Sequence, residues 1–238
     1  LSQAKAANVT SGSILSLITA SQWTDTGYPS GEEKQTGQGV YGPQFAEVDA
    51  AAAELGLQAS IIRAPFFLEN YFGHVATIKE SGTLYAPVDG DVCEPLATAA
   101  DVATALATAA TKPDLAGRVF SVMGDYMSHN QWAQLLSERL SKPVSFVQAP
   151  EAGFIETMMG FGLARWAAEG AVALHNVNPS RVWFDANKGD FTALTGKAPT
   201  DVRAFVDSSL VPAITGRLGY TICSICPTFT VHDWAKAE

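Results

Sequence analysis

Two aromatic rings, a carboxylate and an amide follow one short apolar segment of the chain. The segment, residues 58–63, is rich in β-branched residues and indicates a buried strand. Pro65 ends the ladder pairing, and ligands of open parallel sheets bind at such carboxyl ends of strands. The sequence therefore predicts a ligand-binding loop containing Phe66, Phe67 and Asn70. An equally weighted alternative is a strand-to-helix turn, with the two rings in the core and Asn70 as a turn residue.

A second chemical pattern is the C-x-x-C pair formed by Cys223 and Cys226. Such a pair is typical of redox motifs and of half a zinc site. Zinc needs two further ligands, and only His232 is near in sequence; Pro227 does not favour the helix that a thioredoxin-type motif requires. We therefore expect no metal site, with these two cysteines as weak candidates.

Other titratable residues are expected to have structural roles. His74 and His129 fall at helix positions, where solvation or hydrogen bonding is the commoner role, and His175 ends a helix, where a cation is favoured. Arg63 is expected to pair with a nearby carboxylate rather than to act in catalysis.

Strands and helices alternate around these residues. The patterns predict strands at residues 13–18, 58–63, 118–123 and 142–148. They predict helices at residues 43–55, 67–80, 101–110, 128–140 (with Ser128 as N-cap), 154–175 (broken near Gly160 and Gly162) and 201–208. This alternation is typical of an α/β protein with a mainly parallel sheet.

Composition narrows the class of protein. A chain of 238 residues, 47% hydrophobic and 16% charged, is long enough for one large domain or two small ones. Its net charge of −9 and scattered basic residues argue against nucleic-acid binding. No apolar run approaches the roughly 18 residues of a membrane helix, and no secretory signal is visible. We expect a soluble protein, intracellular or organellar rather than secreted, and the compartment stays open.

Residues 63–70 resemble the Arg-Pro-x-x-Phe-x-Glu-Asn stretch of the NmrA-like family, atypical relatives of the short-chain dehydrogenases/reductases (SDR). Later segments are similar to that family's next strands, helix and terminal Thr-Gly-x-x-Pro signature, in the same order: residues 84–87, 95–103, 117–124 and 195–200. The resemblance covers residues 1–209. It implies a Rossmann-like parallel sheet with a smaller α/β substrate-side lobe, and NADP or NAD as the cofactor.

The resemblance also implies a division into domains. Residues 1–125 correspond to the C-terminal part of a Rossmann-like NAD(P)-binding domain. Residues 126–209, with contributions from 67–95, correspond to the smaller substrate-side lobe. Residues 210–238 form an extra C-terminal tail outside the resemblance.

The glycine-rich turn of a dinucleotide-binding fold has no counterpart in this sequence. That turn, G-x-G-x-x-G, follows a first strand and opens a helix that holds the pyrophosphate. Without the family's opening βα units, the strand at residues 13–18 would have a bare apolar edge. We expect either a longer polypeptide at the N-terminus or a protein partner that covers this edge.

The resemblance implies two of the three catalytic residues of the SDR proteins, the serine and the tyrosine, but not the lysine. Ser16 matches the strand-end serine and Tyr41 the tyrosine, but Phe45 stands where the lysine of Y-x-x-x-K lowers the tyrosine's pKa. Tyr41 is either a residual proton donor or a residue that caps a helix start. The residues implied to line the cofactor are Ser16, Pro65, Phe66, Phe67 and Asn70.

The missing lysine and glycine-rich turn favour a mainly non-catalytic, NAD(P)-associated role. The protein would be a cofactor sensor or an accessory subunit of a larger assembly, and the expectation leans against an enzyme. The alternative is an NAD(P)H-dependent oxidoreductase of the atypical SDR type that uses Tyr41 and Ser16.

Overall fold

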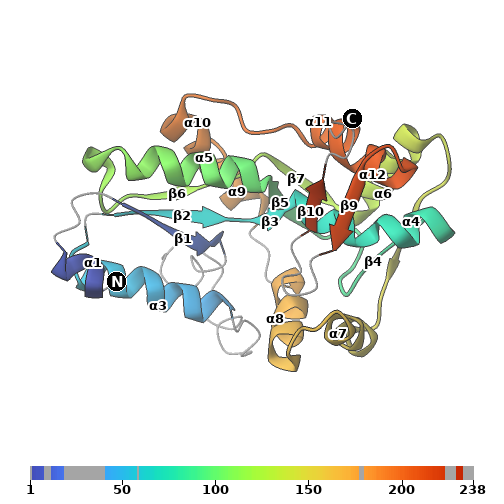
Figure 1. Ribbon diagram of the computed structural model, residues 1–238, viewed down its shortest axis with the longest axis horizontal. Helices are drawn as coiled ribbons and strands as arrows, with labels where there is room; N and C mark the ends of the chain where they lie inside the picture. The colour runs from blue at the N-terminus through green and yellow to red at the C-terminus, as the bar shows by residue number, and fades with distance from the viewer. Residues whose placement is uncertain are drawn as a thin grey trace. The chain divides into compact units, whose positions relative to one another are not determined.

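The chain folds into two compact units (Figure 1). The computed structural model describes residues 2–7, 12–18, 41–57, 59–176, 180–222 and 229–232. Unit 1 comprises Leu1–Phe66, Pro95–Tyr126 and Val177–Pro199, and unit 2 comprises Phe67–Glu94, Met127–Asn176 and Thr200–Glu238. The domain boundaries expected from the sequence stay a prediction.

A parallel sheet forms the centre of unit 1. Its strands are β1 (Ser13–Leu17), β2 (Ser60–Ala64) and β6 (Val119–Ser121), in the order β1-β2-β6. The expected parallel α/β class is therefore confirmed. Among the described residues β1 pairs with β2 alone, and a partner that covers its other edge stays a prediction.

Helices pack against this sheet. Within the described residues, the helices of unit 1 are α1 (Ser2–Ala6), α3 (Tyr41–Glu54), α5 (Ala99–Ala110), the 3-10 helix η4 (Pro113–Leu115), α9 (Arg181–Asn187) and α10 (Asp190–Thr195). α3 contacts β1, α5 contacts β1 and β2, and α10 contacts both α5 and β6. Thr98 caps α5 by accepting a hydrogen bond from the Asp101 N–H, and small alanines let α5 lie close to the strands. α3 starts two residues before the predicted helix, with proline in its first turn.

Three short strands lie where the chain passes between the units. They are β3 (Phe66–Phe67), β5 (Cys93–Ala97) and β7 (Asp125–Ser128), and they pair in the order β3-β5-β7.

Unit 2 combines a two-stranded parallel sheet with helices. Its strands are β4 (Thr83–Ala86) and β8 (Ser145–Gln148), which pair in parallel, and β9 (Gly219–Ile222) and β10 (Phe229–His232), which form an antiparallel pair. Its helices are the 3-10 helix η3 (Leu68–His74), α4 (Val75–Ser81), α6 (His129–Leu140), α7 (Glu151–Gly160), α8 (Arg165–Asn176), α11 (Val202–Phe205), the π-helical turn η5 (Val206–Leu210) and α12 (Val211–Thr215).

Local signals account for much of unit 2. Ser128 is the N-cap of α6, as predicted, and forms a reciprocal capping box with Gln131. The predicted break near Gly160 and Gly162 is confirmed between α7 and α8, where Gly162 has a φ of 94°. The single helix predicted over residues 67–80 is wrong at its start, because a strand and a 3-10 helix precede α4.

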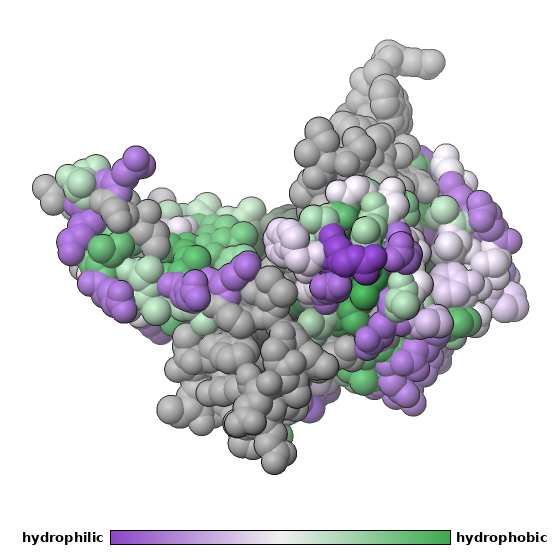
Figure 2. All heavy atoms as spheres, turned by 90° about the horizontal axis from the view of Figure 1, so that it is seen from below, coloured by the Kyte–Doolittle hydropathy of each residue, from purple (hydrophilic) through white to green (hydrophobic). Residues whose placement is uncertain are grey.

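Hydrophilic and hydrophobic residues lie side by side on the face that Figure 2 shows. The exposed large apolar side chains of the described residues are spread over both units: Leu15, Val119 and Val182 in unit 1, and Tyr85, Val147, Phe161 and Trp166 in unit 2. Scattered apolar residues of this kind are normal on protein surfaces. Within the described ranges, none of the helices combines the length and apolar character that crossing a membrane requires.

Candidate functional site

A row of buried polar side chains crosses the parallel sheet of unit 1 near its carboxyl end. Ser16, Arg63 and Ser121 are aligned on neighbouring strands, so their side chains share one face of the sheet. Ser16 is 0% exposed, and its Oγ has no hydrogen-bond partner among the described residues. Buried hydroxyls are usually hydrogen-bonded, which makes this atom a candidate for contact with a ligand.

An ion pair joins helix α3 to Arg63 of this row. The Arg63 Nη2 donates to Asp49 Oδ2 at 3.3 Å, and the two side chains are only 4% and 5% exposed. This confirms the expected pairing of Arg63 with a carboxylate. Phe45 lies one helical turn before Asp49 and Tyr41 one turn earlier still, so the three positions share one side of α3. Phe45 is half-buried and has no group that can donate a proton.

The other residues expected to contact a cofactor lie in the next part of the chain. Pro65 is buried, Phe66 and Phe67 form the half-buried strand β3, and Asn70 is half-buried in η3. Asn70 belongs to unit 2, whereas Ser16, Pro65 and Phe66 belong to unit 1. Their contact with a cofactor stays a prediction.

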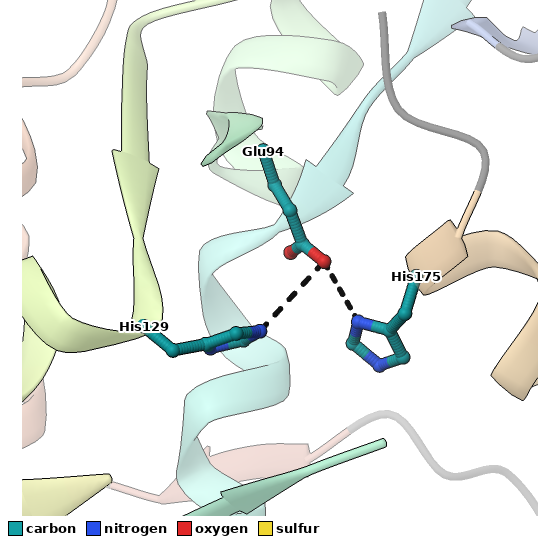
Figure 3. Close-up of side chains that lie close together, drawn as sticks. All are labelled: Glu94, His129 and His175. Atoms are coloured by element: carbon teal, nitrogen blue, oxygen red, sulfur yellow. Dashed lines mark hydrogen bonds and ion pairs between the residues drawn. The ribbon is translucent and has the colours of Figure 1, made fainter. Parts of the chain in front are cut away.

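A cluster that the sequence did not indicate lies inside unit 2. Glu94 of β5, His129 at the start of α6 and His175 at the end of α8 point toward one another (Figure 3). Glu94 Oε1 lies 2.7 Å from His175 Nδ1 and 3.8 Å from His129 Nε2. The three side chains are 3–8% exposed. One ligand atom from each residue lies within 4.8 Å of the others, so the cluster could hold a metal ion.

Aromatic neighbours hold the two imidazoles in place. His129 stacks on Phe146, with ring centroids 4.9 Å apart, and its Nδ1 lies 3.3 Å from the Tyr71 hydroxyl. Tyr71 in turn stacks on the fully buried Trp132 at 3.8 Å. The ring of Phe154 meets His175 edge-on at 6.0 Å. These contacts orient the His129 ring so that Nε2 faces the carboxylate.

Burial changes the pKa values around the cluster. It lowers the pKa of His129, an effect that the Glu94 carboxylate partly opposes and His175 adds to. Burial and the neighbouring imidazoles of His129 and His175 lower the pKa of His74 to about 4. Burial, reinforced by the charge of Glu94, raises the pKa of Tyr71 well above its usual value. Tyr71 therefore stays a neutral hydroxyl, and His74 and His129 favour the neutral imidazole.

Two kinds of chemistry fit this arrangement. A carboxylate between two imidazoles can pass protons, since imidazole accepts at one ring nitrogen and donates at the other. Two neutral imidazoles and a carboxylate are also a common ligand set for divalent transition metals.

Comparison with known proteins identifies the family. The model of the NmrA-like family matches residues 41–173. This chain belongs to the NmrA-like family. The matched range includes the loop at residues 63–70 and two residues of the buried cluster, Glu94 and His129, whereas His175 lies just beyond it.

Known proteins similar to this NmrA-like chain include reductases and a regulator. The NAD(P)H azoreductase of Xenophilus azovorans is 25% identical over 198 residues, which are 83% of this chain and 58% of that protein's length. The structure of the NADPH-dependent quinone oxidoreductase of Escherichia coli with NADPH has a TM-score of 0.69 and 23% identity to this chain. The match covers 88% of this chain and 69% of the oxidoreductase. The negative transcriptional regulator NmrA has a TM-score of 0.58 and 14% identity, covering 86% and 66%. The structural likenesses show the Rossmann-like fold.

Most of the predicted site residues of this NmrA-like chain lie within the described ranges, but the two cysteines of the C-x-x-C pair do not. Ser16, Pro65, Phe66, Phe67 and Asn70 are described, and Tyr41 is placed as the first residue of α3. Cys223 and Cys226 lie outside the described residues, and their chemistry stays a prediction.

The hydrogen-bonded role, one of the two expected of His129, is confirmed by its contact with the Tyr71 hydroxyl, and the buried ring is not solvated. His129 and His175 also lie at helix ends, but their convergence on Glu94 was not expected. The one available signal was Glu94, a carboxylate in an otherwise apolar strand, which must find polar partners when buried.

Proposed function

We propose that this protein is an NAD(P)H-dependent reductase of the atypical SDR type that reduces azo or quinone acceptors. The similarity to NAD(P)H azoreductase, which extends over 83% of the chain, carries the proposal. Membership of the NmrA-like family and the likeness in fold to the NADPH-bound quinone oxidoreductase support it. The reductase therefore displaces the non-catalytic role as the favoured function.

The reaction needs one hydride and one proton for each two-electron step. A bound NAD(P)H would supply the hydride, and Tyr41 would supply the proton. With a quinone, the two would give the hydroquinone. With an azo compound, they would give the hydrazo compound, and a second hydride with a second proton would cleave the remaining N–N bond to two amines.

We assign cofactor contacts to Ser16, Pro65, Phe66, Phe67 and Asn70. The buried Ser16 Oγ, without a hydrogen-bond partner among the described residues, supports this assignment most directly. Tyr41 is assigned as proton donor. Because Phe45 replaces the lysine that would lower the tyrosine's pKa, we expect slow turnover near neutral pH.

Equilibrium titration with NADPH, followed by tryptophan fluorescence, tests cofactor binding. Ser16→Ala should weaken NADPH binding by about three- to tenfold, as expected for loss of one buried hydrogen bond. Ser13→Ala, on the same strand and half-buried, is the matched control and should bind as the wild type does. Absence of binding to the wild-type protein at millimolar NADPH or NADH would overturn the proposal.

Oxidation of NADPH in the presence of a quinone or an azo dye tests the chemistry. Tyr41→Phe should lower kcat by about 10²-fold or more while NADPH affinity is kept. Tyr85→Phe, an exposed tyrosine in unit 2, is the control. Phe45→Lys should raise kcat near neutral pH if Tyr41 is the donor. Equal kcat values in the wild type and Tyr41→Phe would remove Tyr41 from the mechanism.

A cofactor sensor is the second candidate function, and Phe45 at the lysine position favours it. A sensor would bind NADPH with the same dependence on Ser16 but would oxidise it no faster when acceptors are added. Binding without turnover would therefore replace the reductase by the sensor.

A further inference from the structure

We propose that Glu94, His129 and His175 form a binding site for one divalent first-row transition-metal ion, such as zinc, within unit 2. None of its three residues is among the proposed cofactor contacts, and the site goes beyond the proposed reductase. Three ligands come from three different elements, β5, α6 and α8, and their ligand atoms converge within 4.8 Å (Figure 3).

The distances fit ligands that share one ion. Two ligands that each lie about 2.1 Å from a metal are separated by about 3.0 Å at octahedral angles and about 3.4 Å at tetrahedral angles. The separations from Glu94 Oε1, 2.7 Å to His175 Nδ1 and 3.8 Å to His129 Nε2, bracket these values. All three atoms lie within 4.8 Å of one another, so the two imidazole rings would have to move toward each other for all three atoms to bind one ion.

The environment of His129 points to a ligand at Nε2. That nitrogen is buried and has no hydrogen-bond partner among the described residues, because Glu94 Oε1 at 3.8 Å is too far to accept. The Tyr71 hydroxyl occupies the other nitrogen, Nδ1, at 3.3 Å. If Nδ1–H donates to Tyr71, the Nε2 lone pair faces the carboxylate. Metal-bound histidines are usually held in this way, by a hydrogen bond from the second ring nitrogen.

The short contact between Glu94 and His175 holds a proton that must leave Nδ1 of His175 when a metal ion binds there. In the metal-free protein, Nδ1–H of His175 donates to the carboxylate at 2.7 Å. When the ion binds Nδ1, this proton moves to Nε2 of the same ring if His175 is neutral, or to solvent if it is cationic. The carboxylate then binds the ion instead of accepting the hydrogen bond.

The donor set selects the class of ion. Two imidazole nitrogens and one carboxylate oxygen suit zinc, cobalt, nickel and ferrous iron, whereas calcium and magnesium prefer oxygen ligands. Three protein ligands leave at least one coordination position for water or another small ligand. The ion's positive charge would also compensate the buried Glu94 carboxylate.

Titration of the chelator-treated full chain with CoCl₂ and ZnCl₂ tests the site. Cobalt should give a visible d–d absorption band that saturates at one equivalent, and zinc should displace it while magnesium does not. Glu94→Gln, His129→Ala and His175→Ala should each weaken binding at least tenfold. Tyr71→Phe should weaken it by about tenfold, because it removes the partner that orients His129.

Two controls test whether the ion binds at Glu94, His129 and His175 rather than at other side chains. His74→Gln alters a nearby histidine outside the cluster and should bind as the wild type does. A double variant, Cys223→Ser with Cys226→Ser, should keep the cobalt band and the one-to-one stoichiometry. Near-ultraviolet thiolate-to-cobalt absorption that disappears in this double variant, together with the visible band, would assign the metal to the cysteines and overturn the proposal.

The wild-type protein decides the question even if some variants fail to fold. Circular dichroism identifies folded variants, and only these enter the comparison. Absence of a d–d band and of binding heat for the wild type at millimolar metal would overturn the proposal. Unchanged binding in folded Glu94→Gln or His129→Ala would overturn it equally.

Discussion

In unit 1 the buried carboxylate of Asp49 faces the guanidinium of Arg63, whereas in unit 2 the buried carboxylate of Glu94 faces the imidazoles of His129 and His175. Arginine stays protonated in proteins, so the first pair has a fixed charge and ties α3 to β2. Imidazole can be neutral or cationic and can donate a proton, accept one or bind a metal. The first pair is therefore suited to stability, and the second to chemistry.

The largest expected effect comes from Asp49→Asn, because it leaves the Arg63 cation buried without its carboxylate. Loss of one member of a buried ion pair should lower the free energy of unfolding by about 3–5 kcal/mol. Urea denaturation measures this. Asp207→Asn, which breaks the exposed ion pair with Arg139, is the matched control and should cost at most about 1 kcal/mol. Equal costs for the two variants would contradict a stabilising role for the Arg63–Asp49 pair.

Glu94→Gln should cost less, about 1–2 kcal/mol when measured with a chelator present. The amide keeps the size of the side chain, and neutral imidazoles can still hydrogen-bond to its oxygen. A cost as large as that of Asp49→Asn would mean that a cationic imidazole is buried beside Glu94, and the distinction between the two carboxylates would disappear.

The effect expected to be smallest near neutral pH is a pH dependence due to His74. Its folded-state pKa is about 4, below the 6.5 of an unperturbed histidine, so on acidification the unfolded chain takes up the proton first. Stability should therefore fall as the pH drops from about 6.5 toward 4, with about 2 kcal/mol lost at pH 5.

His74→Gln should remove this component, so that its stability relative to the wild type rises on acidification. Denaturation at pH 7, 6 and 5, with a chelator present, gives the comparison. Parallel profiles for the two proteins would show that His74 titrates normally in the folded state.

The sequence predicted those parts of the fold that depend on residues close together in the chain. The β-branched run around Ile61 predicted β2, and Ser128 followed by Gln131 predicted the start of α6. The 3-10 helix η3 was missed because its residues show the same spacing of apolar side chains as an α-helix. The sequence did not decide whether Phe66 and Phe67 belong to the core or to a ligand-binding loop. Their half-buried positions are compatible with either.

The buried cluster could not be predicted from spacing. Glu94, His129 and His175 are far apart in sequence and meet only because β5, α6 and α8 converge. Local patterns placed the two histidines on helices but could not tell which way each imidazole points. Similarly, nothing near Ser16 in sequence indicated that Arg63 and Ser121 would be aligned with it.

The division of each unit into three separate stretches of chain has a consequence for synthesis. Helix α10 contributes the buried Phe191 and Leu194 to unit 1 and contacts α5 and β6, which leave the ribosome much earlier. Until α10 emerges, the apolar surfaces of α5 and β6 that it covers stay exposed on the nascent chain. Ribosomal pausing before residue 190 should therefore increase aggregation and chaperone binding.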